Sequence, residues 1–223
     1  MIRALLLAAG QARRFTGMQK LLATVPGKKG DLPLVRLAAE TIVESSVDEV
    51  IVVLGRDARA VRDALAGLPV RMIVNSAYAS GMSASLRAGV ATAIDDGRMT
   101  GLLVALGDQP ILQVGVVDAV VATFRREADN ESRDQSIVVP RYSGVRGHPV
   151  LFGRALVPEL LALTGDRGAR DVVERDPQRV RYVDVMTPAP TDVDTEDDLG
   201  ALREQLVGRA AGRGSSRGGD QDD

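Results

Sequence analysis

Short apolar runs alternate along this chain with stretches of helical periodicity, and this alternation constrains the fold more than any other feature. The runs are almost continuous in Leu, Ile, Val, Met and Ala, as expected for strands buried on both faces of a sheet, and they occupy residues 3–8, 49–54, 70–75 and 101–106. The intervening pattern predicts helices at 33–45, 57–66 and 82–96, long enough for right-handed crossovers. The sequence therefore predicts an α/β fold with three layers and a doubly wound, mostly parallel sheet.

The pattern changes after a predicted helix at 115–128. Residues 128–135 are polar and charged, so we expect a surface loop there, and the β-runs at 137–140 and 149–152 are separated by only eight residues. Such a link is too short for a helical crossover, which predicts a small antiparallel excursion in the sheet. The remaining elements expected are helices at 155–163 and 168–174, a strand at 179–185 and a closing helix at 195–206. We expect one domain over residues 1–207 and a disordered tail at 208–223, which is rich in Gly and lacks large apolar residues.

Composition narrows the classes of function. The chain of 223 residues has a net charge of -2, and aromatic residues make up 3% of it. It lacks both the basic surface that duplex binding uses and the aromatic faces on which single-stranded bases stack, so we expect no nucleic-acid partner. There is no cysteine, which excludes disulfides and thiolate chemistry. Residues 1–10 are better interpreted as a buried strand than as a signal peptide, and no apolar stretch approaches membrane-spanning length, so we expect a cytoplasmic protein without a membrane partner.

Candidate functional residues follow the predicted strands. In an open parallel sheet, ligands bind beyond the carboxyl ends of the strands. The segment from Gly10 to Lys20 follows the first strand, Asn75 ends the third, and Asp108 follows the fourth. Small residues let backbone N–H groups approach a phosphate, and cations neutralise it. The glycine segment has neither the G-x-G-x-x-G nor the G-x-x-x-x-G-K-[ST] spacing.

These parts suit nucleotidyl transfer. Attack on the α-phosphorus of a nucleoside triphosphate needs charge neutralisation, a divalent ion and alignment, with little covalent help from the protein. Magnesium uses one or two carboxylates together with waters and substrate oxygens, so Asp108 suffices as an anchor. The segment with Asp192 and Asp194 offers a second ligand, and Asp194 is the preferred candidate.

Several segments in unbroken order over residues 2–206 resemble the MobA-like nucleotidyltransferases. The segments are LLLAAGQARRFTGMQKLL, residues 81–86 (GMSASL), LGDQP at 106–110, RGHPVLF at 146–152, GDRGAR at 165–170 and DVDTEDDL at 192–199. The resemblance is closest to the molybdenum cofactor cytidylyltransferases, which join CMP from CTP to molybdopterin. It implies a Rossmann-type fold like that of nucleotide-diphospho-sugar transferases.

The resemblance also implies roles for individual residues. Arg14, Lys20 and Asp108 become the catalytic residues, with Arg14 and Lys20 on the phosphates and Asp108 on Mg²⁺. The nucleotide-binding residues implied or proposed are Leu7, Ala8, Ala9, Gly10, Lys20, Asn75, Gly81, Ser83 and Ser85. The acceptor-binding residues are His148, Asp166 and Arg167. Ala12 stands where the family usually has Ser, and Thr16 is an apparent insertion, which loosens the register of Gly17 and Lys20. The Ala-Ala-Gly sequence favours CTP over GTP.

Each assignment has a purely structural alternative. Gly10 could be an ordinary turn residue, and Asp108 could cap the next helix. Thr195 and Asp198 have the spacing of a capping-box variant, so their neighbour Asp194 could belong to a helix start. Ser83 and Ser85 could open a helix, His148 could shape a loop, and Asp166 with Arg167 could close a turn.

Three functions remain open at this point. The first is transfer of a nucleotide from CTP or GTP to a molybdopterin-type acceptor, with a molybdoenzyme or its chaperone as a further partner. The second is an NAD(P)H-dependent oxidoreductase on the same scaffold, because a fold does not fix chemistry. The third is a non-catalytic chaperone that binds the cofactor or the nucleotide for delivery.

Overall fold

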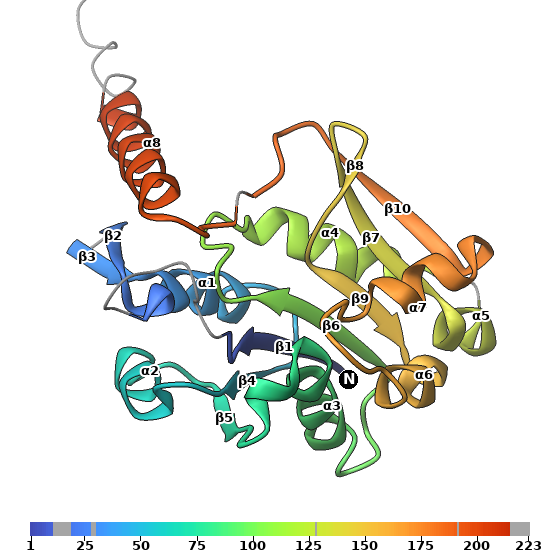
Figure 1. The fold of residues 1–223 in the computed structure, drawn as a ribbon. Coiled ribbons are helices and arrows are strands. Elements are labelled where there is room, and N and C mark those ends of the chain that lie inside the picture. Colours follow the sequence, from blue (N-terminus) through green and yellow to red (C-terminus); the bar gives the residue numbers. More distant parts are fainter. Residues whose placement is uncertain (11–18, 28–29, 128, 191, 215–223) are drawn as a thin grey trace, which may run out of the picture.

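The computed structural model describes residues 1–10, 19–27, 30–127, 129–190 and 192–214, with side chains described up to residue 208. Among these residues, an eight-stranded sheet lies between two layers of helices (Figure 1). One path through the sheet runs β10 (Val180–Val185), β7 (Ile137–Tyr142), β9 (Val150–Gly153), β6 (Gly101–Leu106), β1 (Ile2–Ala8), β4 (Glu49–Leu54) and β5 (Arg71–Val74), and β8 (Val145–Arg146) pairs with β7. The predicted fold class is confirmed.

Strand direction follows the predicted pattern. β1 pairs in parallel with β4 and with β6, and β4 pairs in parallel with β5. β9 pairs antiparallel with both β6 and β7, which is the predicted antiparallel excursion. The carboxyl ends of β1, β4 and β6 therefore meet at one edge of the sheet, where ligands of such folds bind.

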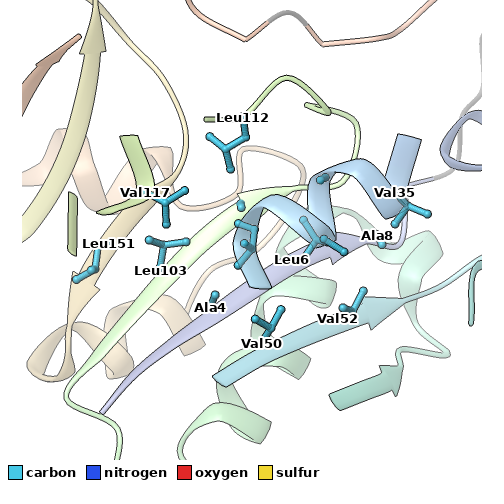
Figure 2. Packing of buried hydrophobic residues seen from close by; sticks show 14 of the residues in the cluster. Ala4, Leu6, Ala8, Val35, Val50, Val52, Leu103, Leu112, Val117 and Leu151 are labelled. Atoms are coloured by element: carbon cyan, nitrogen blue, oxygen red, sulfur yellow. The ribbon is translucent and has the colours of Figure 1, made fainter. Parts of the chain in front are cut away.

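The central strands are continuous apolar runs because both of their faces are buried. Along β1, Ala4, Leu6 and Ala8 face one hydrophobic cluster, whereas Leu5 faces another. Figure 2 shows the first cluster, in which β1 packs with side chains such as Val35 of α1 (Leu34–Val43).

Helices cover both faces of the sheet. The first cluster also contains residues of α2 (Ala58–Ala64) and α4 (Val114–Arg125). The second takes residues from α3 (Met82–Ala93), α6 (Val157–Leu161) and α7 (Arg170–Arg175). Short 3-10 helices complete the connections, at Lys20–Leu22, Tyr78–Ser80, Arg154–Leu156 and Pro177–Arg179.

Two short strands that the sequence pattern did not predict lie outside the main sheet. β2 (Thr24–Gly27) and β3 (Gly30–Pro33) form an antiparallel pair. Val25 of β2 packs in a third hydrophobic cluster with Val193, Leu199 and Leu202, so the pair supports the start of α8 (Glu196–Gly214). α8 stands beside β2 at one end of the molecule (Figure 1).

One expectation about the polar segments was wrong, and another falls largely outside the described residues. Residues 128–135 were expected as a loop, but α5 (Asn130–Gln135) forms there because the side chain of Asp129 accepts a hydrogen bond from the Ser132 backbone N–H and caps the helix. α8 also continues to Gly214, past the predicted start of the tail at residue 208, and the rest of the predicted tail, residues 215–223, lies outside the described residues. No helix in the described ranges is long and apolar enough to cross a membrane.

Candidate active site

Lys20 forms the centre of a charged cluster at the carboxyl edge of the sheet. Its Nζ donates to Asp108 Oδ2 and to Asp194 Oδ1, each at 2.8 Å. Burial alone would lower the pKa of Lys20, but the charge of Asp108 and the hydrogen bonds to both carboxylates outweigh it, so the net pKa is raised. Lys20 therefore carries a full positive charge although it is only 9% exposed.

Backbone hydrogen bonds bring the three members of this cluster together. The N–H of Gly107 donates to the Leu7 carbonyl at 3.0 Å, which ties the end of β6 to the end of β1. The N–H of Val193 donates to the Asp108 carbonyl at 3.2 Å, which places Asp194 beside Asp108. Residues far apart in sequence thus share one corner of the fold.

The helix starts of α4 and α8 bear on two of the structural alternatives. Gln113, and not Asp108, is the residue that precedes α4, so Asp108 is no helix cap. At the start of α8, Asp198 Oδ2 accepts from the N–H groups of Asp194 and Thr195, and the Asp198 N–H donates to Thr195 Oγ1. The capping box is therefore present, but it uses the side chain of Asp198 and leaves that of Asp194 directed at Lys20.

Asp108 and Asp194 suit a divalent cation by their chemistry. Each has a carboxylate oxygen 2.8 Å from the same Lys20 Nζ, so the two oxygens lie at most about twice that distance apart. The side chains are 27% and 49% exposed, which leaves them accessible to a ligand. Among the described residues there is no cluster of three or more acidic, His or Cys side chains that could enclose a metal on its own. Such a pair matches Mg²⁺, which takes its remaining ligands from water and phosphate oxygens.

A cavity of about 430 Å³ opens in front of this cluster. Most of the predicted nucleotide-binding and metal-binding residues line it, namely Leu7, Ala9, Gly10, Lys20, Gly81, Ser85, Asp108 and Asp194. A Cβ built on Gly10 meets no atom of the described residues within 4 Å, so the glycine adds no side chain to the cavity wall. Arg14 lies outside the described residues.

The other predicted nucleotide-binding residues do not line the smaller cavity. Ala8 is fully buried in the first hydrophobic cluster. Asn75 Nδ2 donates to Ser85 Oγ at 3.0 Å, so Asn75 orients a residue that lines the cavity. Ser83 is fully buried and does not line the cavity, and its N–H donates to the Gly165 carbonyl. Its Oγ has no hydrogen-bond partner among the described residues.

A larger cavity of about 790 Å³ adjoins the first. The two cavities share lining residues Leu7, Met82, Leu106 and Asp166. All three predicted acceptor-binding residues, His148, Asp166 and Arg167, line the larger one. Asp166 also has a structural role, because its Oδ1 accepts a hydrogen bond from the Met82 N–H at the start of α3.

Sequence reasoning missed Gln109 and Arg170 among the polar residues of the larger cavity, and it considered a third, Asp192, only as the alternative to Asp194 as a metal ligand. Gln109 and Asp192 both line it, and Gln109 Nε2 donates to Asp192 Oδ1 at 2.7 Å. Arg170 lines it as well, and within the described ranges no hydrogen bond or ion pair engages its guanidinium group. All three lie within the motifs that resemble the family, close to Asp108, Asp194 and Arg167. That proximity in sequence was the one feature that could have indicated a place in the site.

Burial shifts the pKa values of two groups in this cavity. Desolvation raises the pKa of Asp192, and the charges of Asp108 and Asp194 act in the same direction against the hydrogen bond from Gln109. Desolvation lowers the pKa of His148, although the Val104 backbone and nearby acidic residues partly offset it. The imidazole is therefore neutral near neutral pH.

Comparison with known proteins identifies the family of this chain. Residues 4–180 match the MobA-like NTP transferase domain, and the chain belongs to this family. It is 34% identical over 200 residues to the nicotine blue oxidoreductase of Paenarthrobacter nicotinovorans, covering 89% of this chain and 94% of that protein.

Solved structures agree with this assignment. Rv0371c of Mycobacterium tuberculosis superposes with a TM-score of 0.75 at 30% identity, covering 91% of this chain and 97% of that one, and a structure of Rv0371c in complex with manganese is also similar. A nucleotidyl transferase from Methanothermobacter, with a TM-score of 0.74, 24% identity and coverage of 94% and 99%, shares the fold.

Proposed function

We propose that this protein is a magnesium-dependent nucleotidyltransferase. It would transfer a nucleoside monophosphate from a nucleoside triphosphate to a phosphate-bearing acceptor and release pyrophosphate. The observation that carries the proposal is the cluster of Lys20, Asp108 and Asp194 in the wall of a cavity that adjoins a second, larger cavity. Two adjoining cavities suit a donor and an acceptor, and family membership supports the class of reaction.

The chemistry follows from the residues of the smaller cavity. A phosphate oxygen of the acceptor attacks the α-phosphorus in line; a new P–O bond forms, the bond to the β-phosphate breaks, and pyrophosphate leaves with the electron pair. Lys20 donates to phosphate oxygens and stabilises the developing charge, because its pKa is raised and its ammonium group is fixed. Asp108 and Asp194 would hold a divalent ion, which supplies further neutralisation of phosphate charge. A phosphate acceptor is already ionised near neutral pH, so no side chain needs to remove a proton.

The proposed donor is CTP, with GTP as the alternative, and the proposed acceptor is molybdopterin or a related cofactor. The Ala8-Ala9-Gly10 sequence supports CTP through the family resemblance. The larger cavity offers the exposed Arg170 as a cation for an acceptor phosphate. Delivery of the product to a molybdoenzyme or its chaperone would complete this role.

Asp108→Asn tests the proposal directly. The change keeps the size of the side chain but removes the charge that anchors the divalent ion. We expect pyrophosphate release from CTP, magnesium and molybdopterin to fall by at least about a hundredfold, the scale on which removal of one transition-state contact acts.

Asp184→Asn is the matched control, because Asp184 lies on β10, pairs with Arg141 and does not line either cavity. It should release pyrophosphate at the wild-type rate. Full turnover by a folded Asp108→Asn variant, judged by its thermal unfolding, contradicts the assigned role of Asp108.

The second candidate is an NAD(P)H-dependent oxidoreductase, which the similarity to nicotine blue oxidoreductase favours. The two functions separate in parallel assays. Consumption of NAD(P)H with a pigmented heterocycle, in the absence of any triphosphate, would support the oxidoreductase. Magnesium-dependent thermal stabilisation by one of the four ribonucleoside triphosphates would support the transferase. Tight nucleotide binding without turnover in either assay would indicate a chaperone.

A further inference from the structure

A third cavity, of about 390 Å³, lies where β7, β8 and β10 adjoin α7 (Figure 1). The buried side chains of Val173 and Val180 form its apolar base, and Pro177 adds an exposed apolar side. Part of its wall, including Arg146, also belongs to the larger cavity, but none of its lining residues belongs to the Lys20 cluster. The cavity is therefore a separate pocket beside the proposed site of nucleotidyl transfer.

The β7–β8 hairpin places two arginines opposite each other. Ser143 and Gly144 form its turn with φ = 46° and 90°, the left-handed conformations that a two-residue hairpin turn of this kind requires. The resulting register pairs Arg141 of β7 directly with Arg146 of β8, and both residues line the third cavity. Like charges at directly opposed positions of neighbouring strands destabilise the pair. The turn thus brings two positive charges to one cavity at a cost in local stability.

Acidic side chains offset these charges only in part. Arg141 donates two hydrogen bonds to Asp184, at 2.7 and 3.1 Å, but Asp184 does not line the cavity. Glu174 does line it, but its Oε2 accepts from Arg167 at 3.0 Å, and its Oε1 lies 3.8 Å from Arg146 Nη2, beyond hydrogen-bond distance. Within the part of the chain that the structure describes, no hydrogen bond engages the Arg146 guanidinium group. This group therefore has donors available for an anionic ligand.

Tyr182 of β10 adds a flat surface to the cavity. The guanidinium carbon of Arg141 lies 4.9 Å from the centroid of the Tyr182 ring, and the two hydrogen bonds to Asp184 fix the plane of the guanidinium group. The side chains of Arg141 and Arg146 are 39% and 47% exposed, and Tyr182 is 42% exposed. A ligand in the cavity can therefore reach all three side chains.

We propose that the third cavity is a further binding site, which takes a flat aromatic molecule that carries a carboxylate. The carboxylate lies between Arg141 and Arg146, where its charge offsets their mutual repulsion, and it accepts hydrogen bonds from the planar guanidinium group of Arg146. The aromatic ring packs against Tyr182 and the apolar base of the cavity. This site goes beyond the proposed function and does not depend on it, because no residue of the Lys20 cluster takes part.

Three matched probes test the proposal on the wild-type protein. They are 2-naphthoate, the neutral 2-naphthamide, and decahydro-2-naphthoate, whose saturated rings are not flat. Titration of the full chain, followed by the NMR signals of each probe, should show the naphthamide binding at least about tenfold more weakly than the naphthoate, because it lacks the charge. The saturated acid should bind at least about threefold more weakly, because it cannot stack. Equal affinity in either comparison, or no binding of the naphthoate, overturns the proposal.

Variants then locate the bound probe. Arg141→Gln and Arg146→Gln should each weaken binding of the naphthoate by about tenfold and leave that of the naphthamide unchanged. Arg170→Gln is the matched control, because Arg170 is an exposed arginine that lines the larger cavity and not the third one. It should bind the naphthoate with wild-type affinity. Full affinity in both folded variants of the third cavity, or a tenfold loss in Arg170→Gln, places the probe elsewhere and overturns the proposal.

Thermal unfolding separates loss of the site from loss of the fold. Without a ligand, Arg146→Gln removes the repulsion between the paired arginines, so its midpoint should equal or exceed that of the wild type. The naphthoate should raise the midpoint of the wild type and not that of Arg146→Gln. A midpoint of unliganded Arg146→Gln clearly below the wild-type value, or equal stabilisation of both proteins by the naphthoate, contradicts the proposal. Pyrophosphate release from CTP is measured with other ligands and tests other residues, so either proposal can fail alone.

Discussion

At the scale of single residues, Lys20 shows how an ion pair determines the charge of a buried group. Burial favours the neutral amine, but the neighbouring carboxylates of Asp108 and Asp194 raise the pKa above its usual value. A raised folded-state pKa means that this interaction stabilises the fold below the ordinary lysine pKa of 10.5 and is lost as the pH rises through the folded value. Lys20 is therefore a permanent cation over the physiological range and can serve phosphate binding.

Gly10 gives a prediction at the same scale. Within the part of the chain that the structure describes, a Cβ at this position meets no atom within 4 Å, and the residue lines the smaller cavity. Gly10→Ala should leave the free energy of unfolding within about 0.5 kcal/mol of wild type and weaken binding of magnesium and CTP by about tenfold, because the methyl group occupies ligand space. Urea denaturation and a nucleotide titration measure the two effects.

Gly115→Ala is the matched control for that change. Gly115 is an exposed residue of α4, its added Cβ also meets nothing within 4 Å, and it lines neither cavity. Nucleotide affinity should be unchanged in this variant. Unaltered affinity in Gly10→Ala as well would remove Gly10 from the nucleotide site.

At the scale of elements, the start of α3 depends on its contact with the 165–168 turn. Gly81 has φ = 104°, and a Cβ there would lie 2.6 Å from Asp166 Oδ1 and 2.8 Å from the Gly165 carbonyl oxygen. Asp166 in turn accepts a hydrogen bond from the Met82 N–H. The glycine thus lets the helix and the turn approach closely at the wall that both cavities share.

Gly81→Ala should destabilise the protein by more than about 2 kcal/mol. The positive φ alone costs about 1–2 kcal/mol for a residue with a Cβ, and overlap with Asp166 and Gly165 adds to it. Gly97→Ala separates these two causes, because Gly97 has φ = 69° but open space around the added Cβ. Urea denaturation should show a clearly larger loss for Gly81→Ala, and equal losses would mean that the close contact with the turn contributes nothing.

At the scale of the whole molecule, the sequence pattern predicted the elements that are buried on both faces and missed those defined by local or distant polar contacts. The strands β1, β4 and β6 were predictable because burial on both faces imposes continuous apolar runs. The β2–β3 pair was not, because its short segments contain Pro and Gly and depend on contacts with α8. Helix α5 depends on one capping side chain, that of Asp129.

The same division applies to the candidate site. The proximity of Lys20 to Asp108 could be predicted, because the carboxyl ends of neighbouring parallel strands meet at one edge. The pairing of Gln109 with Asp192 could not, because Asp192 lies in the irregular segment between β10 and α8, whose path no sequence periodicity predicts. Arg3 shows the same limit: it is 2% exposed, and its ion pairs with Glu49 and Asp96 leave no periodic pattern in the sequence.

His148 links the site to the pH dependence of global stability. It is the only histidine of the chain, and its folded-state pKa lies below the ordinary value of 6.5. The unfolded chain therefore binds a proton before the folded protein does, so this group stabilises the fold fully above about pH 6.5, and the contribution is lost as the pH falls toward the folded value. The slope for one group is at most about 1.4 kcal/mol per pH unit.

The raised folded-state pKa of Asp192 has the opposite effect, because it stabilises the fold as the pH falls. This contribution is the same in the wild type and in His148→Phe, so it cancels when the two are compared. Urea denaturation of the wild type and of His148→Phe between about pH 5 and pH 7 should show the wild type losing stability more steeply on acidification. The two curves should run parallel above this range, where the imidazole is neutral in both the folded and the unfolded state. Parallel curves throughout would mean that the pKa of His148 is the same in the folded and the unfolded chain, so that burial does not lower it.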